Sequence, residues 1–195
     1  MSERLNELLA RLHEVKGEIQ DEIEKGREGF HYRIEHGRVR FDSEVRRRHR
    51  GLREGWLSFL SRTRFLVVIT APVIYSLIIP FVILDLFVTL YQAICFPVYG
   101  IPKVRRRDYI AIDRQHLAYL NGLQKLNCVY CGYGNGLIAF VREVAGRTES
   151  YWCPIKHSRR LASTHEHYGS FADYGAAETL REDWEEAREQ VQKEK

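Results

Sequence analysis

The amino-acid sequence predicts a mainly α-helical protein with a membrane-inserted segment, and three observations lead to this fold class. One long apolar stretch, from Phe65 to Tyr99, lies between basic flanks. Both ends of the chain carry apolar residues at alternating three- and four-residue steps, the spacing of amphipathic heptad helices. Cysteine and histidine residues in the second half have the spacing of a metal site. We therefore expect a small cytoplasmic helical domain with metal-binding knuckles, together with a short β-hairpin.

Composition limits the class of protein further. The 195 residues include 30 Lys and Arg against 26 Asp and Glu, a net charge of +4. The four cysteines are too few for a secreted disulfide framework, which favours a reducing compartment. No cleavable leader is expected, because the chain before Phe65 is charged. We expect an amphipathic helix, a β-hairpin with a basic interfacial helix, the membrane segment, a Cys/His domain and a second amphipathic helix, in residues 1–28, 29–64, 65–99, 100–172 and 173–195.

The two terminal helices each carry one apolar stripe. The N-terminal stripe consists of Leu5, Leu8, Leu12, Val15 and Ile19, and the C-terminal stripe of Ala177, Leu180, Trp184, Ala187 and Val191. A helix of this kind cannot hide its stripe alone in water. We expect the helices to pair with each other, with a second copy in a homo-oligomer, or with another membrane or cytoplasmic protein. The alternative is that both helices dock on unrelated surfaces.

The region between the first helix and the apolar stretch predicts a hairpin followed by an interfacial helix. Apolar and polar residues alternate on both sides of Gly37, which can adopt the backbone conformation of a tight turn. Asp42 or Ser43 then offers an N-cap to a basic helix whose aromatic residues suit a membrane interface. Nucleic-acid binding is the rival interpretation of the basic run RRRHR. We expect none, because the charges adjoin an apolar segment and no nucleic-acid-reading fold is recognisable.

The apolar stretch is longer than the roughly 20 residues that one crossing needs. Pro72 and Pro80 interrupt helical hydrogen bonding, and a break near Pro80 predicts a membrane-inserted helical hairpin. The alternative is one long, tilted and kinked span. Arginine and lysine flank both ends of the stretch, so the hairpin places both termini in the cytoplasm, at the cytoplasmic (inner) membrane.

Asp85 is the one charged residue inside the apolar stretch. An intramembrane carboxylate is costly and is normally paired. Asp85 is therefore a candidate for proton or ion handling, for the turn of the hairpin, or for pairing with an arginine of a neighbouring subunit.

The predicted metal ligands are Cys128, Cys131, Cys153 and His157, in the sequences CVYCGYGNG and YWCPIKH. Two such pairs can close the tetrahedral shell that zinc prefers, with iron or an iron-sulfur cluster as the alternative. Glycines after Cys131 predict a backbone that folds back on itself, with the cysteines where helices join. His165 and His167 are possible extra ligands, although a solvent-facing loop accounts for them equally. Reduced thiols or a redox-active C-x2-C pair are the non-metal alternatives.

Two fragments resemble known families. CVYCGY followed by WCP resembles the two knuckles of rubredoxin-like and zinc-ribbon proteins, although Lys156 stands where their second knuckle has a cysteine. The C-x3-H ending is similar to the CDGSH-type iron-sulfur proteins, whose first pair is C-x-C. These resemblances imply iron, zinc or a two-iron cluster. Each covers less than a fifth of the chain.

The expected function is that of a membrane-anchored, zinc-binding adaptor or assembly protein. A closed four-ligand shell leaves no position for substrate, and the sequence has no H-E-x-x-H motif, phosphate loop or nucleophile elbow. We therefore expect no enzymatic activity. The alternative is a membrane-bound iron-sulfur or rubredoxin-like electron-transfer protein.

Overall fold

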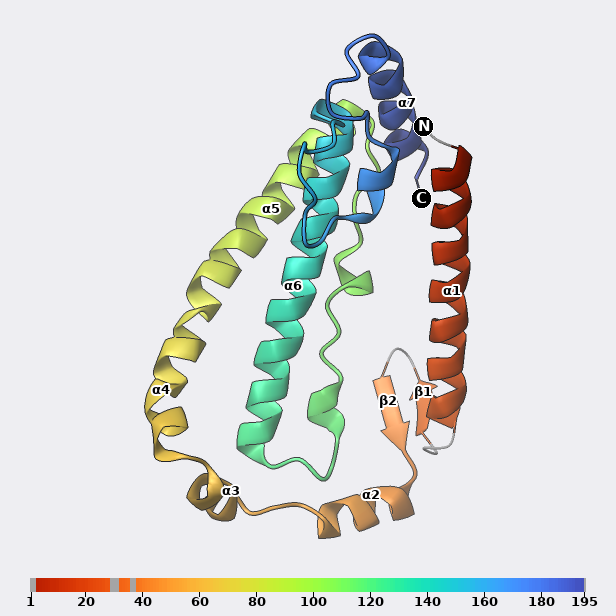
Figure 1. Cartoon of the computed structure of the whole chain (residues 1–195). Coiled ribbons are helices and arrows are strands. Elements are labelled where there is room, and N and C mark those ends of the chain that lie inside the picture. The colour runs from red at the N-terminus through yellow and green to blue at the C-terminus, as the bar shows by residue number, and fades with distance from the viewer. Residues whose placement is uncertain (1–2, 29–31, 36–37, 195) are drawn as a thin grey trace. The chain divides into compact units, whose positions relative to one another are not determined.

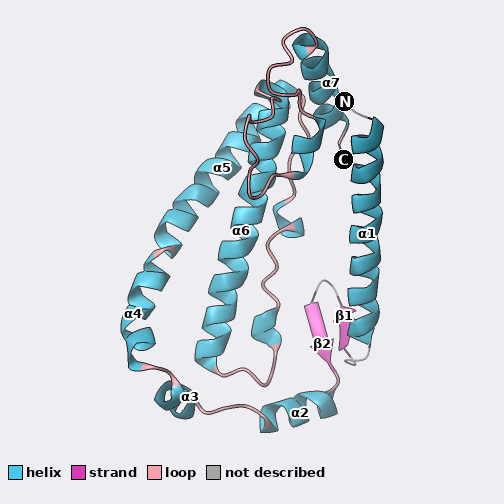
Figure 2. Ribbon diagram, viewed as in Figure 1, coloured by secondary structure: helices cyan, strands magenta, loops and turns pink. Residues whose placement is uncertain are grey.

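The computed structural model of the chain is mainly helical, as the sequence predicts (Figures 1 and 2). It describes residues 3–28, 32–35 and 38–194. The chain forms two compact units. Unit 1 comprises residues 1–10, 81–109 and 136–195, and unit 2 comprises residues 11–80 and 110–135.

Helix α1 covers Glu3–Glu28, and the stripe residues Leu8, Leu12, Val15 and Ile19 are exposed on it. The exposed fractions are 51% for Leu12, 41% for Val15 and 54% for Ile19. Charged residues fill the positions between them, so the helix is amphipathic. The stripe is therefore a surface that the described chain does not use for its own core.

Unit 2 contains the two strands and the basic helices. Strands β1 (Tyr32–Glu35) and β2 (Arg38–Phe41) pair antiparallel, while Gly37 lies outside the described residues. Helix α2 follows over Ser43–Gly51, and α3 over Trp56–Arg62. The His49 ring makes edge contacts with Phe41 and Tyr119, at ring-centre distances of 5.4 and 5.3 Å. These contacts tie α2 to β2 and to the segment before α6.

The apolar stretch is helical almost throughout, in α4 (Phe65–Ser76) and α5 (Ile78–Tyr99). Only Leu77 separates them, and its backbone stays in the helical region with φ −64° and ψ −12°. Pro80 lies in the first turn of α5, where a missing N–H costs no hydrogen bond. The predicted reversal near Pro80 is therefore wrong, and the local backbone agrees with the alternative of one kinked helix.

Helix α6 covers Gly122–Trp152, 31 residues without interruption. The sequence prediction placed a backbone reversal at its glycines, and this is wrong because residues 132, 134 and 136 are buried within the helix. A glycine inside a helix costs only about 1 kcal/mol. At Gly132 a Cβ atom would come within 2.9 Å of the Ala111 carbonyl oxygen, so the glycine permits close packing instead of a turn.

The core of the described chain lies in unit 1. Its buried apolar residues come from α5, from the segment after it, from α6, from the connection between α6 and α7, and from α7 (Leu180–Lys193). They are Phe96, Ile101, Val104, Leu137, Phe140, Val144, Phe171, Ala172, Ala187 and Val191. Short 3-10 turns, η1 (Arg106–Asp108), η2 (Arg114–His116) and η3 (Glu166–Ser170), occur in the connecting segments.

Part of the predicted C-terminal stripe packs inside unit 1. Ala187 and Val191 are 2% and 1% exposed, and the Trp184 indole N–H donates to the Tyr151 carbonyl over 3.0 Å. Ala177 lies before α7 and is exposed, and Leu180 is half-buried, so unit 1 covers only the later part of the predicted stripe. That the stripe binds another helix or protein stays a prediction.

Candidate functional site

The structure does not bring the four predicted metal ligands together. Cys128 and Cys131 lie inside α6, Cys153 follows the last residue of that helix, and all are free thiols. A helix rises about 1.5 Å per residue, so Cys131 and Cys153 are about 33 Å apart along the axis. The ring of His157 stacks on Tyr168, with centres 6.1 Å apart. A Cys3His shell for zinc, or a cluster held by the same residues, does not form with α6 intact.

Asp85 has its partner within the same chain. It is 7% exposed and forms an ion pair with Arg106 of η1, and the Thr89 hydroxyl donates to it over 3.3 Å. Gln92, about two turns further along the same face of α5, accepts from the Val104 amide over 3.1 Å and donates to the Val104 carbonyl over 3.4 Å. The segment after α5 thus pairs with the polar residues of the helix. This pairing supports a structural role for Asp85.

A cluster of histidine and glutamate side chains forms where α6, η3 and the end of α7 meet in unit 1. His167 contacts Glu143 through Nε2 at 3.2 Å and Glu194 through Nδ1 at 3.1 Å. Arg147 contacts the same two carboxylates, with its Nε 2.7 Å from Glu143 and an Nη 3.1 Å from Glu194. Two cations and two carboxylates therefore form a closed ring of ion pairs.

Burial and pairing act against each other on the pKa values in this ring. Burial alone raises the pKa of Glu143, but hydrogen bonds from His167 and Arg147 outweigh it and lower the pKa to about 2. Burial alone lowers the pKa of His167, but hydrogen bonds to Glu143 and Glu194 outweigh it and raise the pKa to about 9. At neutral pH His167 therefore carries a proton on each ring nitrogen and donates to both carboxylates.

His165 lies beside this ring in the opposite protonation state. Burial lowers its pKa, and the hydrogen bond to Glu149, 2.9 Å from Nε2, offsets only part of that effect. Its Nδ1 is buried without a hydrogen-bond partner among the described residues. A Cβ atom at Gly146 would come within 3.0 Å of both histidine rings, so this glycine lets the two rings pack against α6.

Glu143, His167 and Glu194 are also possible metal ligands. One potential ligand atom of each lies within 4.8 Å of the other two. A metal ion binding there would have to displace a proton from the His167 ring. The Arg147 guanidinium, bonded to both carboxylates, already supplies positive charge there. These residues therefore form an ion-pair ring in the structure, and the same three side chains offer possible ligand atoms for a metal ion. The two histidines predicted as possible extra metal ligands both lie here. His167 belongs to the ion-pair ring, His165 lies next to it, and neither side chain faces open solvent.

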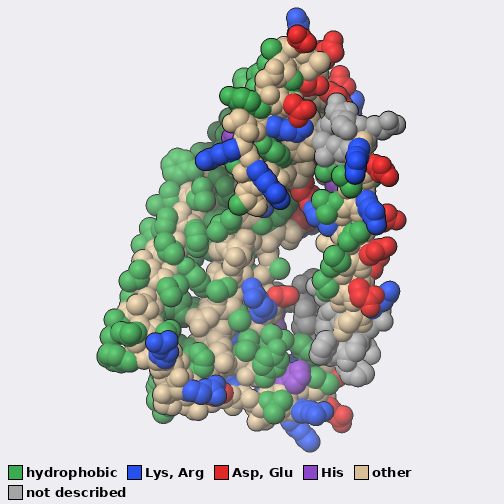
Figure 3. Space-filling view, in the orientation of Figure 1, with side chains coloured by type: hydrophobic (Ala, Val, Ile, Leu, Met, Phe, Trp, Pro, Cys, Tyr) green, Lys and Arg blue, Asp and Glu red, His purple; other side chains and the backbone are tan. Residues whose placement is uncertain are grey.

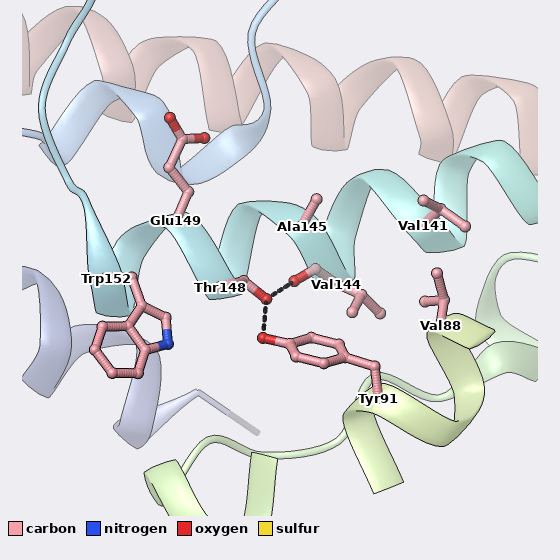
Figure 4. A pocket seen from close by; sticks show the side chains of 8 residues that line it. All are labelled: Val88, Tyr91, Val141, Val144, Ala145, Thr148, Glu149 and Trp152. Carbon is pink, nitrogen blue, oxygen red and sulfur yellow. Dashed lines mark hydrogen bonds between the residues drawn. The ribbon is translucent and has the colours of Figure 1, made fainter. Parts of the chain in front are cut away.

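An apolar groove of about 350 Å³ lies between α5 and α6 in unit 1 (Figure 4). The Thr148 hydroxyl donates to the Val144 carbonyl over 2.7 Å, so the Tyr91 hydroxyl is the donor in its 3.0 Å contact with Thr148. The Glu149 carboxylate points away from the Tyr91 ring. Since its polar groups are already paired, the groove offers apolar surface instead of a reactive group.

Comparison with family models, curated proteins and solved structures finds no match to this chain. The ion-pair ring itself was missed by the sequence analysis. The pair of Glu143 and Arg147 could have been predicted, because a spacing of four residues places opposite charges side by side on a helix. The part played by Glu194 could not have been predicted, since only the fold brings the end of α7 to α6.

Proposed function

We propose that the protein is a membrane-anchored adaptor or assembly protein. The apolar surface of α4 and α5 holds the folded units on a bilayer, and the open stripe of α1 binds a second protein chain. The observation that carries the proposal is the exposure of Phe65–Tyr99. Among the described residues, this stretch of 35 is long and apolar enough to cross a membrane. Its 18-residue apolar window has a mean hydropathy of 2.5, and none of that window is buried.

The polar residues of α5 support the proposal because they lie on one side of the helix. Asp85, Gln92 and Phe96 are buried in unit 1, and Val88 and Tyr91 between them are half-buried. The other sides carry exposed leucine, isoleucine, valine and phenylalanine, which Figure 3 shows as hydrophobic side chains along α5. An unpaired polar group in hydrocarbon costs several kcal/mol, and here each inward polar group has a protein partner.

Aromatic residues at the end of α5 also suit a membrane interface. The Tyr99 ring stacks on Tyr151 with centres 4.9 Å apart, and Trp152 contacts both rings while remaining 50% exposed. Arg188 lies over the Tyr151 ring at 4.7 Å. Tyrosine, tryptophan and arginine together are typical of the headgroup region, where one end of the side chain is apolar and the other is wet.

The segment after α5 favours contact with lipid on one face only. Residues 100–105 are not helical, and this segment pairs with α5 at Gln92 and Asp85. Irregular backbone is tolerated at membrane depth only where protein covers it. We therefore infer that α5 presents its apolar face to lipid while unit 1 covers the opposite face. This arrangement leaves both termini on one side, which we propose is the cytoplasmic side because of the basic flanks.

The experiment compares two matched triple-lysine variants of the full chain. The first replaces outward residues of α5 and the second replaces residues of the α1 stripe with similar exposure, as Ile83→Lys, Phe87→Lys, Leu90→Lys and as Leu12→Lys, Val15→Lys, Ile19→Lys. A lysine within hydrocarbon costs about 3 kcal/mol. We expect the α5 variant to leave the membrane fraction in flotation and alkaline extraction, while the α1 variant stays there.

Cross-linking of the same variants tests the adaptor role. We expect wild type and the α5 variant to form cross-linked complexes through α1, and the α1 variant to lose them. If the α5 variant stays with the membrane as tightly as wild type, the anchoring proposal is wrong. If all three proteins cross-link alike, α1 is not the binding surface.

A further inference from the structure

The loop between α6 and η3 forms a hollow of about 500 Å³ in unit 1, lined by residues 156–164 and by Tyr168. Its first stem is fixed by backbone contacts. The Lys156 amide donates to the Ala172 carbonyl over 2.9 Å, and the His157 amide donates to the Tyr168 hydroxyl over 2.7 Å. The hollow is therefore anchored where the loop leaves the folded part of the unit.

The second stem is held by a side chain of α6. The Arg142 guanidinium donates to the Ser163 hydroxyl over 3.0 Å and also to the Thr164 carbonyl. Residues 158–162 connect the two stems and line the hollow. The loop that lines the hollow is thus held at one stem by Tyr168 of η3 and at the other by Arg142 of α6.

The charges lining this hollow are positive. Lys156 is neutralised by Asp173, with Nζ 2.7 Å from the carboxylate. Arg159 and Arg160 are exposed and have no hydrogen bond or ion pair with the residues that the structure describes. No acidic residue lines the hollow, whereas Ser158, Ser163 and Thr164 supply hydroxyl groups. Figure 3 shows Lys and Arg side chains standing out over this region.

We propose that this hollow binds a phosphate group carried by a larger molecule. Two neighbouring guanidinium groups present forked N–H donors that match phosphate oxygens, and hydroxyls add further donors. A volume of about 500 Å³ exceeds what a lone phosphate fills and lies in the range of small-molecule sites. The phosphate comes from an anionic lipid headgroup or from a soluble phosphate ester, and the chemistry of recognition is the same for both.

The test uses the full-length protein in detergent and in nanodiscs. The soluble probe is glycerol 3-phosphate, followed by calorimetry, and the lipid probe is a phosphatidylcholine nanodisc with or without phosphatidic acid. The test variant is Arg159→Gln/Arg160→Gln. The control, Arg181→Gln/Lys193→Gln, removes the same charge from exposed positions of α7 in the same unit.

We expect wild type to bind one of the two probes at physiological ionic strength, and the test variant to bind it at least about tenfold more weakly. The control should stay within about twofold of wild type. Binding of glycerol 3-phosphate assigns a soluble ester, and binding that requires phosphatidic acid assigns a headgroup. Binding of neither probe overturns the proposal, as does an equal loss in both variants, which indicates general electrostatic attraction. The soluble arm does not depend on membrane anchoring, so the two proposals fail separately.

Discussion

His167 links two distant parts of the sequence through one protonated ring. Glu143 belongs to α6 and Glu194 follows α7, and both accept a hydrogen bond from His167. The His167 imidazole is mostly buried, with a side-chain exposure of 11%, so solvent screens its contacts with the two carboxylates only weakly. The end of α7 is therefore held to α6 by contacts that depend on protonation.

The pKa values give this link a defined pH range. The pKa of His167 rises from 6.5 to about 9 on folding, so its contribution is fully present below pH 6.5 and is lost as the pH rises through 9. The pKa of Glu143 falls from 4.5 to about 2, so its contribution is present above pH 4.5 and is lost as the pH falls through 2. The ion-pair ring therefore stabilises the folded protein most between pH 4.5 and pH 6.5, where both contributions are present.

We expect the free energy of unfolding to decrease by about 2 kcal/mol between neutral pH and pH 9, because His167 loses its proton. His167→Gln should be less stable at neutral pH and should lack this decrease. Urea unfolding in mild detergent over a pH series measures both effects. His116→Gln, at an exposed position, is the control and should follow wild type. A parallel decline in wild type and His167→Gln would show that another group is responsible.

At the scale of elements, the sequence pattern predicts helices better than it predicts their ends. Apolar spacing at Leu137, Phe140 and Val144 identifies part of α6, and all three residues are buried in the core. The glycines before Leu137 suggested a break because glycine permits turns, but sequence does not show whether a close neighbour occupies the space. Gly132 meets the Ala111 carbonyl and Gly146 meets two histidines. Those contacts arise only from tertiary packing.

For the same reason, the sequence did not show that the four predicted metal ligands lie apart. C-x2-C spacing is typical of knuckles only if a turn lies between the two thiols, and Cys128 and Cys131 instead lie on one helix. Ala187 and Val191 of the predicted C-terminal stripe pack in the core of unit 1, which spacing does not reveal. Asp85 was expected to need a partner, and Arg106 supplies it.

The positions of the cysteines predict independent thiol chemistry. Cys131 and Cys153 are both exposed, the first inside α6 and the second just after its end. We expect maleimide to label both in the native protein, and stoichiometric zinc to protect neither. A Cys3His site would protect both together, and Cys131→Ser would then expose Cys153. Peptide mass spectrometry after labelling, with and without zinc, measures each residue separately. Joint protection would restore the zinc site and would require α6 to break.

At the scale of the whole molecule, two arrangements on the membrane differ in their consequences. A helix that crosses the bilayer exports one end of the chain, whereas a helix that lies with one face in lipid exports neither. Three features favour the second arrangement for Phe65–Tyr99. Its polar residues share one face, non-helical chain pairs with that face, and basic residues such as Arg64 and Arg105 stand at both ends.

Reporter fusions distinguish these arrangements directly. We expect reporters at Met1, at Lys195 and within the connection at Asp113 all to be active on the cytoplasmic side, because one-face contact moves no part of the chain across hydrocarbon. A crossing would instead place the Met1 reporter opposite the other two, since the apolar stretch lies between them. Inserting a known transmembrane span before Met1 provides the matched control, because it must invert only the N-terminal reporter. If Met1 alone is reached from outside in the unmodified protein, unit 1 cannot cover α5 as the structure describes it, because Arg106 and the non-helical segment beside it would then have to lie in lipid.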